Sequence, residues 1–242
     1  ITTAYVLYGL YALLLVTGIL CLCRGAGQAV SVSMPRVSVI VPAHNENENI
    51  APLIQCLRAQ QYPAALVECI FVDDRSTDGT GEVIRSRTRG MDTVRIITIR
   101  SVTGRVSPKK NALMAGINAA SGEIILTTDA DASPGPLWIR IMVSRFDTGT
   151  VMVCGYAPYS TDPPLSGLFH KLAALEYFSL GSVAAAAACT GHPLTCNGAN
   201  LAFRRQAFLD IGGYGRDILV LSGDDDLLLH RMKRLSEGRI KF

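Results

Sequence analysis

The sequence predicts an α/β domain whose mostly parallel sheet is flanked by helices and preceded by one N-terminal transmembrane helix. Three observations support this prediction. Short β-branched runs alternate with segments of helical periodicity between residues 36 and 127. Acidic motifs follow three of these runs directly. The stretch from Ala4 to Cys23 is apolar apart from its tyrosines, Thr17 and two glycines.

The alternation of strand and helix patterns sets the topology. Strands are predicted at 37–41, 69–72, 94–99 and 123–127, and helices at 49–60, 79–89 and 110–120. Strands that alternate with helices of this length are typical of βαβ units and a parallel sheet. Because such crossovers share one hand, the carboxyl ends of all four strands are expected at one edge of the sheet.

The apolar N-terminal stretch is long enough to cross a bilayer, which takes roughly 20 residues in a helix. A signal peptide is the alternative, but the stretch lacks a basic leading region and a small-residue cleavage site. We expect an anchor at 1–24, a small-residue linker at 25–35 and one domain at 36–242. Arg24 and Arg36 flank only the C-terminal side of the anchor, which predicts a cytoplasmic domain at the cell (inner) membrane.

Composition excludes several classes of protein. The chain has 242 residues, 49% of them hydrophobic, and a formal charge of +3, which does not indicate a nucleic-acid binder. The seven cysteines are scattered without C-x-x-C spacing, so neither a disulfide framework nor a zinc site is predicted. The chain lacks an initiator Met and stops abruptly, and we expect it to be a fragment at both ends.

Two carboxylates follow the fourth predicted strand. Asp129-Ala130-Asp131 comes after the apolar run 124–128, at the edge where open α/β sheets bind ligands. Hard oxygen ligands suit Mg²⁺ or Mn²⁺, and substrate phosphates usually complete the coordination of such an ion. The D-x-D pattern alone also occurs in solvated turns. Its position beside two further acidic clusters favours the metal site.

The first two strand ends carry Pro42–Glu46 and Asp73–Gly79. Turn formers such as Asn45 and Gly79 are explained by the chain reversal alone. The adjacent carboxylates of Asp73 and Asp74 repel each other and are tolerated best where donors or a cation meet them. We interpret Asp74 as an acceptor for a base or ribose.

Phosphate requires positive charge, and the chain has neither a G-x-G-x-x-G nor a P-loop motif. Arg105, Lys109 and Lys110 precede the helix that leads into the fourth strand. We expect Lys109 to reach a diphosphate and Lys110 to face solvent, as most residues of a basic run do.

These motifs, taken in order, resemble family 2 glycosyltransferases with the GT-A fold. The matching segments are 37–46, 72–80, 109–113, 129–131, 196–205, 207–208, 212–214 and 222–229. The ordered set is specific, and it covers nearly everything after residue 35.

The resemblance implies a donor site, a metal and a base. It places Pro42, Ala43, Glu46, Asp73, Asp74, Lys109, Asp129 and Asn200 around a nucleotide-sugar, usually a UDP-sugar. It gives Asp131, with Asp129, the divalent cation. Asp225 corresponds to the family's general base, with Asp224 beside it. A glycan or lipid-linked hydroxyl would attack with inversion at the anomeric carbon.

Other interpretations remain for parts of this pattern. The triplet 224–226 is also typical of the acidic first turn of a helix at 227–235. The run 124–131 resembles haloacid-dehalogenase-type phosphatases, with Asp129 as nucleophile. A non-catalytic membrane protein that binds nucleotide-sugar is the third alternative, and it would not need Asp225.

The segment 165–188 is apolar along most of its length, with His170, Lys171 and Glu176 as interruptions. Two alternatives stand: a core helix packed on the sheet, or an amphipathic helix at the membrane surface. No catalytic role is assigned to His170 or His192.

Overall fold

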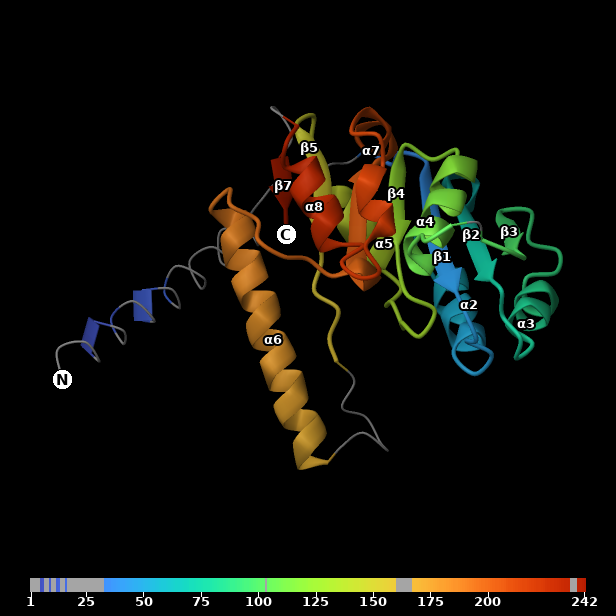
Figure 1. Ribbon diagram of the computed structural model, residues 1–242, viewed down its shortest axis with the longest axis horizontal. Helices are drawn as coiled ribbons and strands as arrows, with labels where there is room; N and C mark the ends of the chain where they lie inside the picture. Colours follow the sequence, from blue (N-terminus) through green and yellow to red (C-terminus); the bar gives the residue numbers. More distant parts are fainter. Residues whose placement is uncertain are drawn as a thin grey trace.

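The computed structural model describes residues 33–102, 104–159, 167–235 and 239–242, and six separate positions before residue 17. Most of the predicted anchor at 1–24 and linker at 25–35 lies outside the described residues. The described residues form a seven-stranded sheet in the order β3-β2-β1-β4-β6-β5-β7, with helices on both faces (Figure 1).

The first four strands are parallel and confirm the predicted βαβ pattern. They are β1 (Val37–Ala43), β2 (Val67–Asp74), β3 (Val94–Ile99) and β4 (Ile124–Thr127). β1 lies in the middle and pairs with both β2 and β4. The crossover helices are α2 (Ile50–Arg58), α3 (Thr80–Arg87) and α4 (Pro108–Ala119). Each lies within one or two residues of its predicted range.

The remaining strands make the sheet mixed. They are β5 (Thr150–Cys154), β6 (Leu201–Arg204) and β7 (Arg239–Lys241). β6 runs antiparallel to both β4 and β5, while β7 is parallel to β5. The short helices of this half are α5 (Trp138–Ser144), α7 (Arg205–Asp210) and α8 (Asp226–Met232). Three 3₁₀ turns are η1 (Ala64–Leu66), η2 (Gly198–Asn200) and η3 (Gly215–Leu219).

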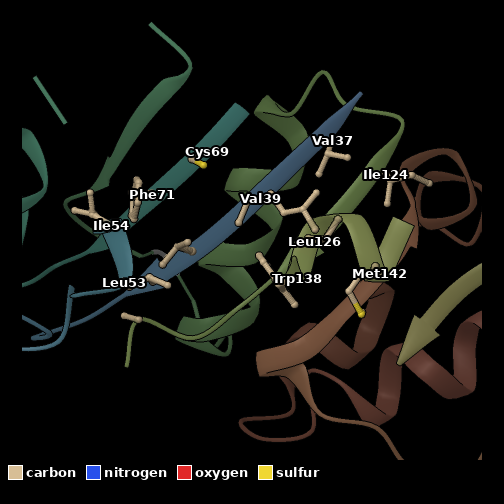
Figure 2. Close-up of a cluster of buried hydrophobic side chains, with 14 of the residues drawn as sticks. Val37, Val39, Leu53, Ile54, Cys69, Phe71, Ile124, Leu126, Trp138 and Met142 are labelled. Atoms are coloured by element: carbon tan, nitrogen blue, oxygen red, sulfur yellow. The ribbon is translucent and has the colours of Figure 1, made fainter. Parts of the chain in front are cut away.

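The alternation of side chains along β1 divides the core into two layers. Val39 and its alternate neighbours face α2, α3 and α5, and Figure 2 shows this cluster with Trp138 and Met142. Ile40 faces the opposite layer, where Leu113 of α4 and Phe208 of α7 pack. Since both faces are covered, the parallel strands are continuous apolar runs rather than alternating ones.

The long helix α6 (Leu168–Cys189) extends away from the sheet (Figure 1). Its buried residues are three alanines near its C-terminal end, Ala184, Ala185 and Ala188. The interpretation of this segment as a core helix is therefore wrong. Seven large apolar side chains are more than half exposed: Leu168, Phe169, Leu172, Leu175, Phe178, Leu180 and Val183. Among the described residues, α6 is the one helix long and apolar enough to cross a membrane.

The loop between α4 and β4 crosses β1 closely and sets the start of β4. Gly122 donates its N–H to Ser38 Oγ at 2.8 Å, and Ser121 donates its N–H to Glu68 Oε1 at 2.6 Å. A Cβ atom at Gly122 would lie 2.5 Å from Ser38 N and 2.7 Å from Val37 C. Because both of these are backbone atoms, a side chain at this position cannot be accommodated without moving β1.

We predict that Gly122→Ala destabilises the domain by about 1–3 kcal/mol, the usual cost of overpacking. Chemical unfolding in urea measures this. Gly135→Ala is the matched control, because nothing lies within 4 Å of its added Cβ. Equal free energies of unfolding for the two variants would contradict the close crossing.

Candidate active site

The parallel strands bring the predicted acidic motifs to one edge of the sheet. β1 ends at Ala43, β2 at Asp74, and Asp129 follows β4 within two residues. Asn45 and Arg75, just past the first two strands, have φ of 57° and 58°. This left-handed conformation is uncommon outside glycine, and here it reverses the chain directly at the strand ends.

The loops that follow β1 and β2 are bonded to each other. Glu46 N–H donates to Thr80 Oγ1 at 2.8 Å, and Asn47 N–H donates to Asp78 Oδ2 at 3.0 Å. His44 Nδ1 lies 2.6 Å from the carbonyl oxygen of Asp74. The segments 42–46 and 73–79 therefore form one continuous wall at this edge.

Separate donors meet the adjacent carboxylates of β2. Arg75 donates to both oxygens of Asp74, at 2.7 and 3.0 Å. Asp73 Oδ1 accepts the N–H of Ser76 at 3.3 Å. Both carboxylates are buried. Arg75 was not predicted as a site residue, although its place beside the acidic pair was a signal for it.

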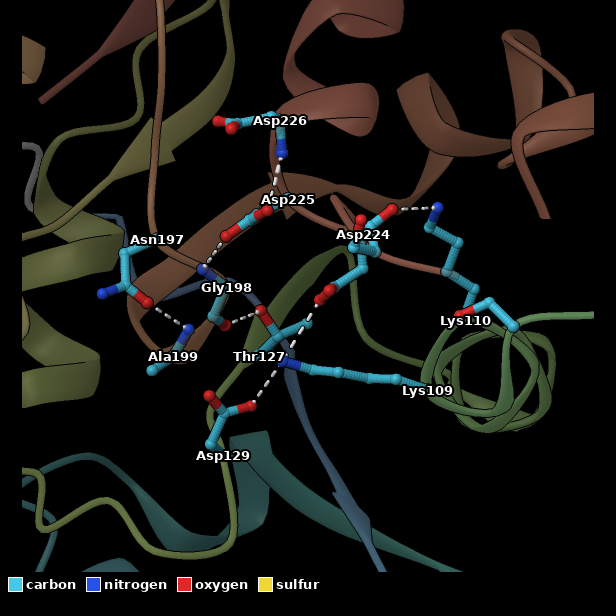
Figure 3. Close-up of polar contacts among 12 residues, drawn as sticks. Lys109, Lys110, Thr127, Asp129, Asn197, Gly198, Ala199, Asp224, Asp225 and Asp226 are labelled. Atoms are coloured by element: carbon cyan, nitrogen blue, oxygen red, sulfur yellow. Dashed lines mark hydrogen bonds and ion pairs between the residues drawn. The ribbon is translucent and has the colours of Figure 1, made fainter. Parts of the chain in front are cut away.

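Lys109 lies between the β4 tip and the loop before α8. Its Nζ is 2.8 Å from Asp129 Oδ1 and 3.3 Å from Asp224 Oδ2 (Figure 3). Burial alone would lower the pKa of Lys109, but the two carboxylates outweigh it and raise that pKa above its usual value. Two carboxylates far apart in the sequence are thus held together by one ammonium group.

The three aspartates of the triplet have three different environments. Asp225 caps α8: Oδ1 accepts the N–H of Asp226 at 2.8 Å, and Oδ2 accepts the N–H of Gly198 at 3.0 Å. Asp226 accepts from Thr195 Oγ1 at 2.8 Å and from the N–H of Cys196 at 3.1 Å. Asp224 contacts Lys109. The acidic first turn was predicted for a helix at 227–235, and α8 begins one residue earlier.

The loop that meets Asp225 is also tied to β4. Thr127 Oγ1 donates to the carbonyl oxygen of Gly198 at 2.8 Å, and the N–H of the same glycine contacts Asp225. Figure 3 shows this path from the D-x-D strand to the acidic triplet. The geometry therefore couples the two acidic motifs through backbone as well as through Lys109.

The expectation that Lys110 faces solvent is wrong. Its side chain is fully buried, and its Nζ donates to the carbonyl oxygens of Asp217, Val220 and Ser222 at 3.0, 2.8 and 2.8 Å. The position of the loop that supplies these carbonyls, more than a hundred residues along the chain, is not visible in the local basic run.

A cleft of about 1450 Å³ opens on one side of the D-x-D tip. Asp129, Asp131 and Asn200 line it. Asn200 accepts from Trp138 Nε1 at 2.8 Å and donates to the carbonyl oxygen of Tyr156 at 2.8 Å. Aromatic side chains supply much of the rest of the wall, from Trp138, Tyr156, Tyr159 and Tyr177.

The other predicted donor residues do not line this cleft. Pro42, Ala43, Glu46, Asp73 and Asp74 belong to the wall formed by the β1 and β2 loops. The candidate site therefore has two parts, and the D-x-D tip after β4 lies between them because β4 is the neighbour of β1.

The acidic residues of the tip suit a divalent cation that a ligand helps to hold. The Asp131 carboxylate is exposed and has no hydrogen-bond or ion-pair partner in the described part of the chain. Among the described residues, no group of three His, Cys, Asp or Glu side chains could hold a metal by itself. Mg²⁺ and similar ions are usually bound through one or two carboxylates and substrate phosphates, which this donor set matches.

The mixed sheet and its flanking helices define an α/β protein with a GT-A-like fold. The sequence profile described as "Glycosyl transferase family 2" matches residues 38–212. The chain therefore belongs to glycosyltransferase family 2, and the resemblance seen in its motifs is confirmed.

Two relatives illustrate the match in sequence. The chain is 33% identical to the glycosyltransferase AglE of Haloferax volcanii, over 53% of this chain and 41% of that protein. It is 32% identical to the undecaprenyl-phosphate 4-deoxy-4-formamido-L-arabinose transferase of Yersinia enterocolitica, over 59% of this chain and 42% of that one. The chain thus spans less than half the length of each.

Two solved structures illustrate the match in fold. The mannosyltransferase PcManGT of Pyrobaculum calidifontis, in complex with GDP-Man and Mn²⁺, has a TM-score of 0.66 and 23% identity, covering 97% of this chain and 64% of that one. The glucosyl-3-phosphoglycerate synthase of Mycobacterium tuberculosis, in complex with Mn²⁺, UDP and phosphoglyceric acid, has a TM-score of 0.53 and 25% identity, covering 86% and 67%.

Proposed function

We propose that this chain carries the catalytic domain of a metal-dependent, inverting glycosyltransferase. It moves a sugar from a nucleotide-sugar, in our proposal a UDP-sugar, to the hydroxyl group of a glycan or lipid-linked acceptor at the cytoplasmic face of the membrane. One observation carries the proposal: Lys109 joins Asp129 of the D-x-D tip to Asp224 of the acidic triplet. A donor-binding motif and a base-bearing motif therefore face each other at one edge of the sheet.

The wall formed by the β1 and β2 loops is the proposed nucleotide site. Pro42, Ala43 and Glu46 supply its first half, and Asp73 and Asp74 supply its second half. The two halves are pre-organised, since their backbone amides already bond across the loops. A rigid wall of this kind binds a flat base without a large cost in ordering. Solved relatives hold GDP-Man in one case and UDP in another, so direct titration must decide between the nucleotides.

Asp131 and Asp129 are the proposed ligands of Mg²⁺ or Mn²⁺, and the ion would be completed by the donor diphosphate. Such an ion offsets the negative charge that develops on the departing nucleoside diphosphate. Lys109 supplies a second positive charge at the same place. When the donor is present, we propose that the Lys109 ammonium group turns from Asp129 toward the diphosphate. The ion pair with Asp224 keeps this ammonium group near the diphosphate.

Asp225 is the proposed general base. Each of its carboxylate oxygens accepts one backbone N–H, from Gly198 and Asp226, which leaves a further lone pair on each oxygen. The carboxylate is therefore held in place and can still accept the proton of an attacking hydroxyl group. A positioned base contributes roughly 10²–10⁴-fold to rate. One displacement, without a glycosyl-enzyme, inverts the anomeric carbon.

The alternatives make different use of the same residues. A phosphatase would use Asp129 as its nucleophile, whereas the matched family consists of glycosyltransferases. A protein that only binds nucleotide-sugar would not need a fixed carboxylate at Asp225.

The cleft beyond the D-x-D tip is the proposed acceptor site, and α6 is the proposed membrane contact. Tyr177 and Cys189 of α6 line the cleft, while the apolar side chains of the helix are exposed. An exposed apolar patch of this size marks an interaction surface. A helix at the bilayer surface would deliver a lipid-linked acceptor directly into the cleft.

Nucleotide titration tests the donor site and the metal together. UDP added to the detergent-solubilised chain in a calorimeter is expected to bind more tightly with Mn²⁺ than without it, and more tightly than GDP. Asp131→Ala is expected to remove the Mn²⁺-dependent gain. Asp210→Ala on α7, an exposed acidic residue at the opposite edge, is the matched control. An unchanged Mn²⁺-dependent affinity in Asp131→Ala would exclude Asp131 from the metal site.

Asp225→Asn tests the base. We expect it to bind UDP and Mn²⁺ as the unsubstituted chain does. It should release the nucleoside diphosphate, UDP from UDP-glucose or UDP-N-acetylglucosamine and GDP from GDP-mannose, roughly 10²–10⁴ times more slowly. Asp224→Asn, measured in parallel, keeps the base and removes the negative charge of one partner of Lys109. Comparable turnover in Asp225→Asn and in the unsubstituted chain would return the base to Asp224 or elsewhere.

The membrane contact of α6 is open to a fluorescence test. In a Trp138→Phe background, Leu172→Trp places the single indole on the exposed part of α6. Brominated lipids are expected to quench it when the chain is reconstituted into vesicles. Leu209→Trp on α7, at the opposite edge of the sheet, is the control. Equal quenching at the two positions, or none at either, would contradict a membrane contact through α6.

A further inference from the structure

The segment 217–222, directly before the acidic triplet, buries little apolar surface of its own. Leu219, Val220 and Leu221 are 60%, 46% and 77% exposed. Apart from the end of η3, the segment has no helix or strand. A loop of this kind would ordinarily be mobile, because few buried contacts oppose its conformational entropy. Something else must fix its position.

The first turn of α4 provides that restraint through five hydrogen bonds. Lys110 Nζ donates to the carbonyl oxygens of Asp217, Val220 and Ser222. Ser107 donates its N–H to the carbonyl of Ile218 at 2.7 Å and its Oγ–H to that of Leu221 at 3.2 Å. Most carbonyls of the segment are thus bound to two residues of one helical turn.

Lys110 is unusual because it is fully buried without a carboxylate partner. Its ammonium group lies within ion-pair distance of no acidic side chain among the described residues. Its three protons meet three carbonyl oxygens, which saturates its donors. Tyr214 lies beside it, with the ring centroid 6.0 Å from Nζ. Burying an ammonium group is costly, so a lysine retained here indicates a specific use of its donors.

The contacts of the adjacent residue, Lys109, show which part of the candidate site the restraint by Lys110 affects. Lys109 contacts Asp129 and Asp224, while Lys110 holds the backbone that ends at Ser222. Gly223 follows with φ of 69°, a conformation that favours glycine, and turns the chain into the triplet. Fixing the carbonyl of Ser222 therefore fixes where Asp224 and Asp225 begin.

We propose that Lys110 is a positioning residue that sets the placement of the acidic triplet relative to the D-x-D tip. The inference rests on the proposed function, in which Asp225 is the base. Lys110 touches neither donor nor acceptor. It acts through the backbone of 217–222, and α4 delivers both this restraint and the D-x-D strand that follows it.

Lys110→Met tests the proposal, since methionine keeps the unbranched shape and most of the length of the side chain and removes its donors. We expect amide hydrogen exchange in 217–226 to accelerate at least about tenfold while β1 and β2 exchange as before. Mn²⁺-dependent UDP affinity should stay within about twofold. Release of UDP from UDP-glucose should fall about 10²-fold in kcat with the donor KM retained, because a displacement of about 1 Å costs that much.

Two further variants control this experiment. Lys233→Met removes a lysine that donates to a single carbonyl, that of Pro193, at 3.3 Å, and should change neither exchange in 217–226 nor turnover. Ser107→Ala removes one of the five restraining bonds and should produce the same pattern as Lys110→Met, weakened to a few-fold. It also tests the proposal if Lys110→Met does not fold.

The outcomes separate the inference from the proposed function. Unchanged exchange in 217–226, equal acceleration throughout the domain, or a loosened segment with normal turnover would each overturn the role of Lys110. Failure of the unsubstituted chain to bind UDP or GDP would overturn the proposed function instead, and the exchange data would still decide whether Lys110 fixes the segment.

Discussion

The parallel pairing of β1 with both β2 and β4 is the constraint on which the site depends. It places three loops at one edge and fixes their order, with the β1 loop in the middle. Its cost is that both faces of the sheet must be covered, which explains the two apolar layers around Val39 and Ile40. The polar chemistry is confined to the edge because no face of the central strands is available for it.

That constraint is also why much of the domain could be predicted. β1 to β4 and their crossover helices are specified by local patterns of β-branched residues, prolines and turn formers. β5, β6 and β7 were not predicted as strands, because segments as short as Leu201–Arg204 and Arg239–Lys241 become strands only through partners distant in the chain. The sheet is mixed because β6 is antiparallel to its neighbours β4 and β5. Local sequence does not indicate this direction.

The candidate site also has features that could be predicted from the sequence and features that could not. Residues that follow a strand directly, such as Asp74 and Asp129, could be located from the sequence because the strand locates them. The separate environments of Asp224, Asp225 and Asp226 depend on where α8 begins, and three identical residues give no local sign of it. The burial of Lys110 depends on carbonyls from residues 217–222. Chemistry that depends on backbone partners is the part that sequence patterns miss.

The first turn of α4 holds two neighbouring lysines to two different tasks, and this limits how the chain can vary. A helix rotates by about 100° per residue, and α4 is anchored by buried residues such as Leu113 and Ile117. The insertion or loss of one residue directly after Lys110 would therefore turn both ammonium groups away from their partners at once. A substitution, in contrast, affects the contacts of one side chain only. Length variation among relatives of this chain should therefore occur in the loop before Ser107 and not in the first turn of α4. A change of register there disrupts more contacts than the replacement of any one side chain.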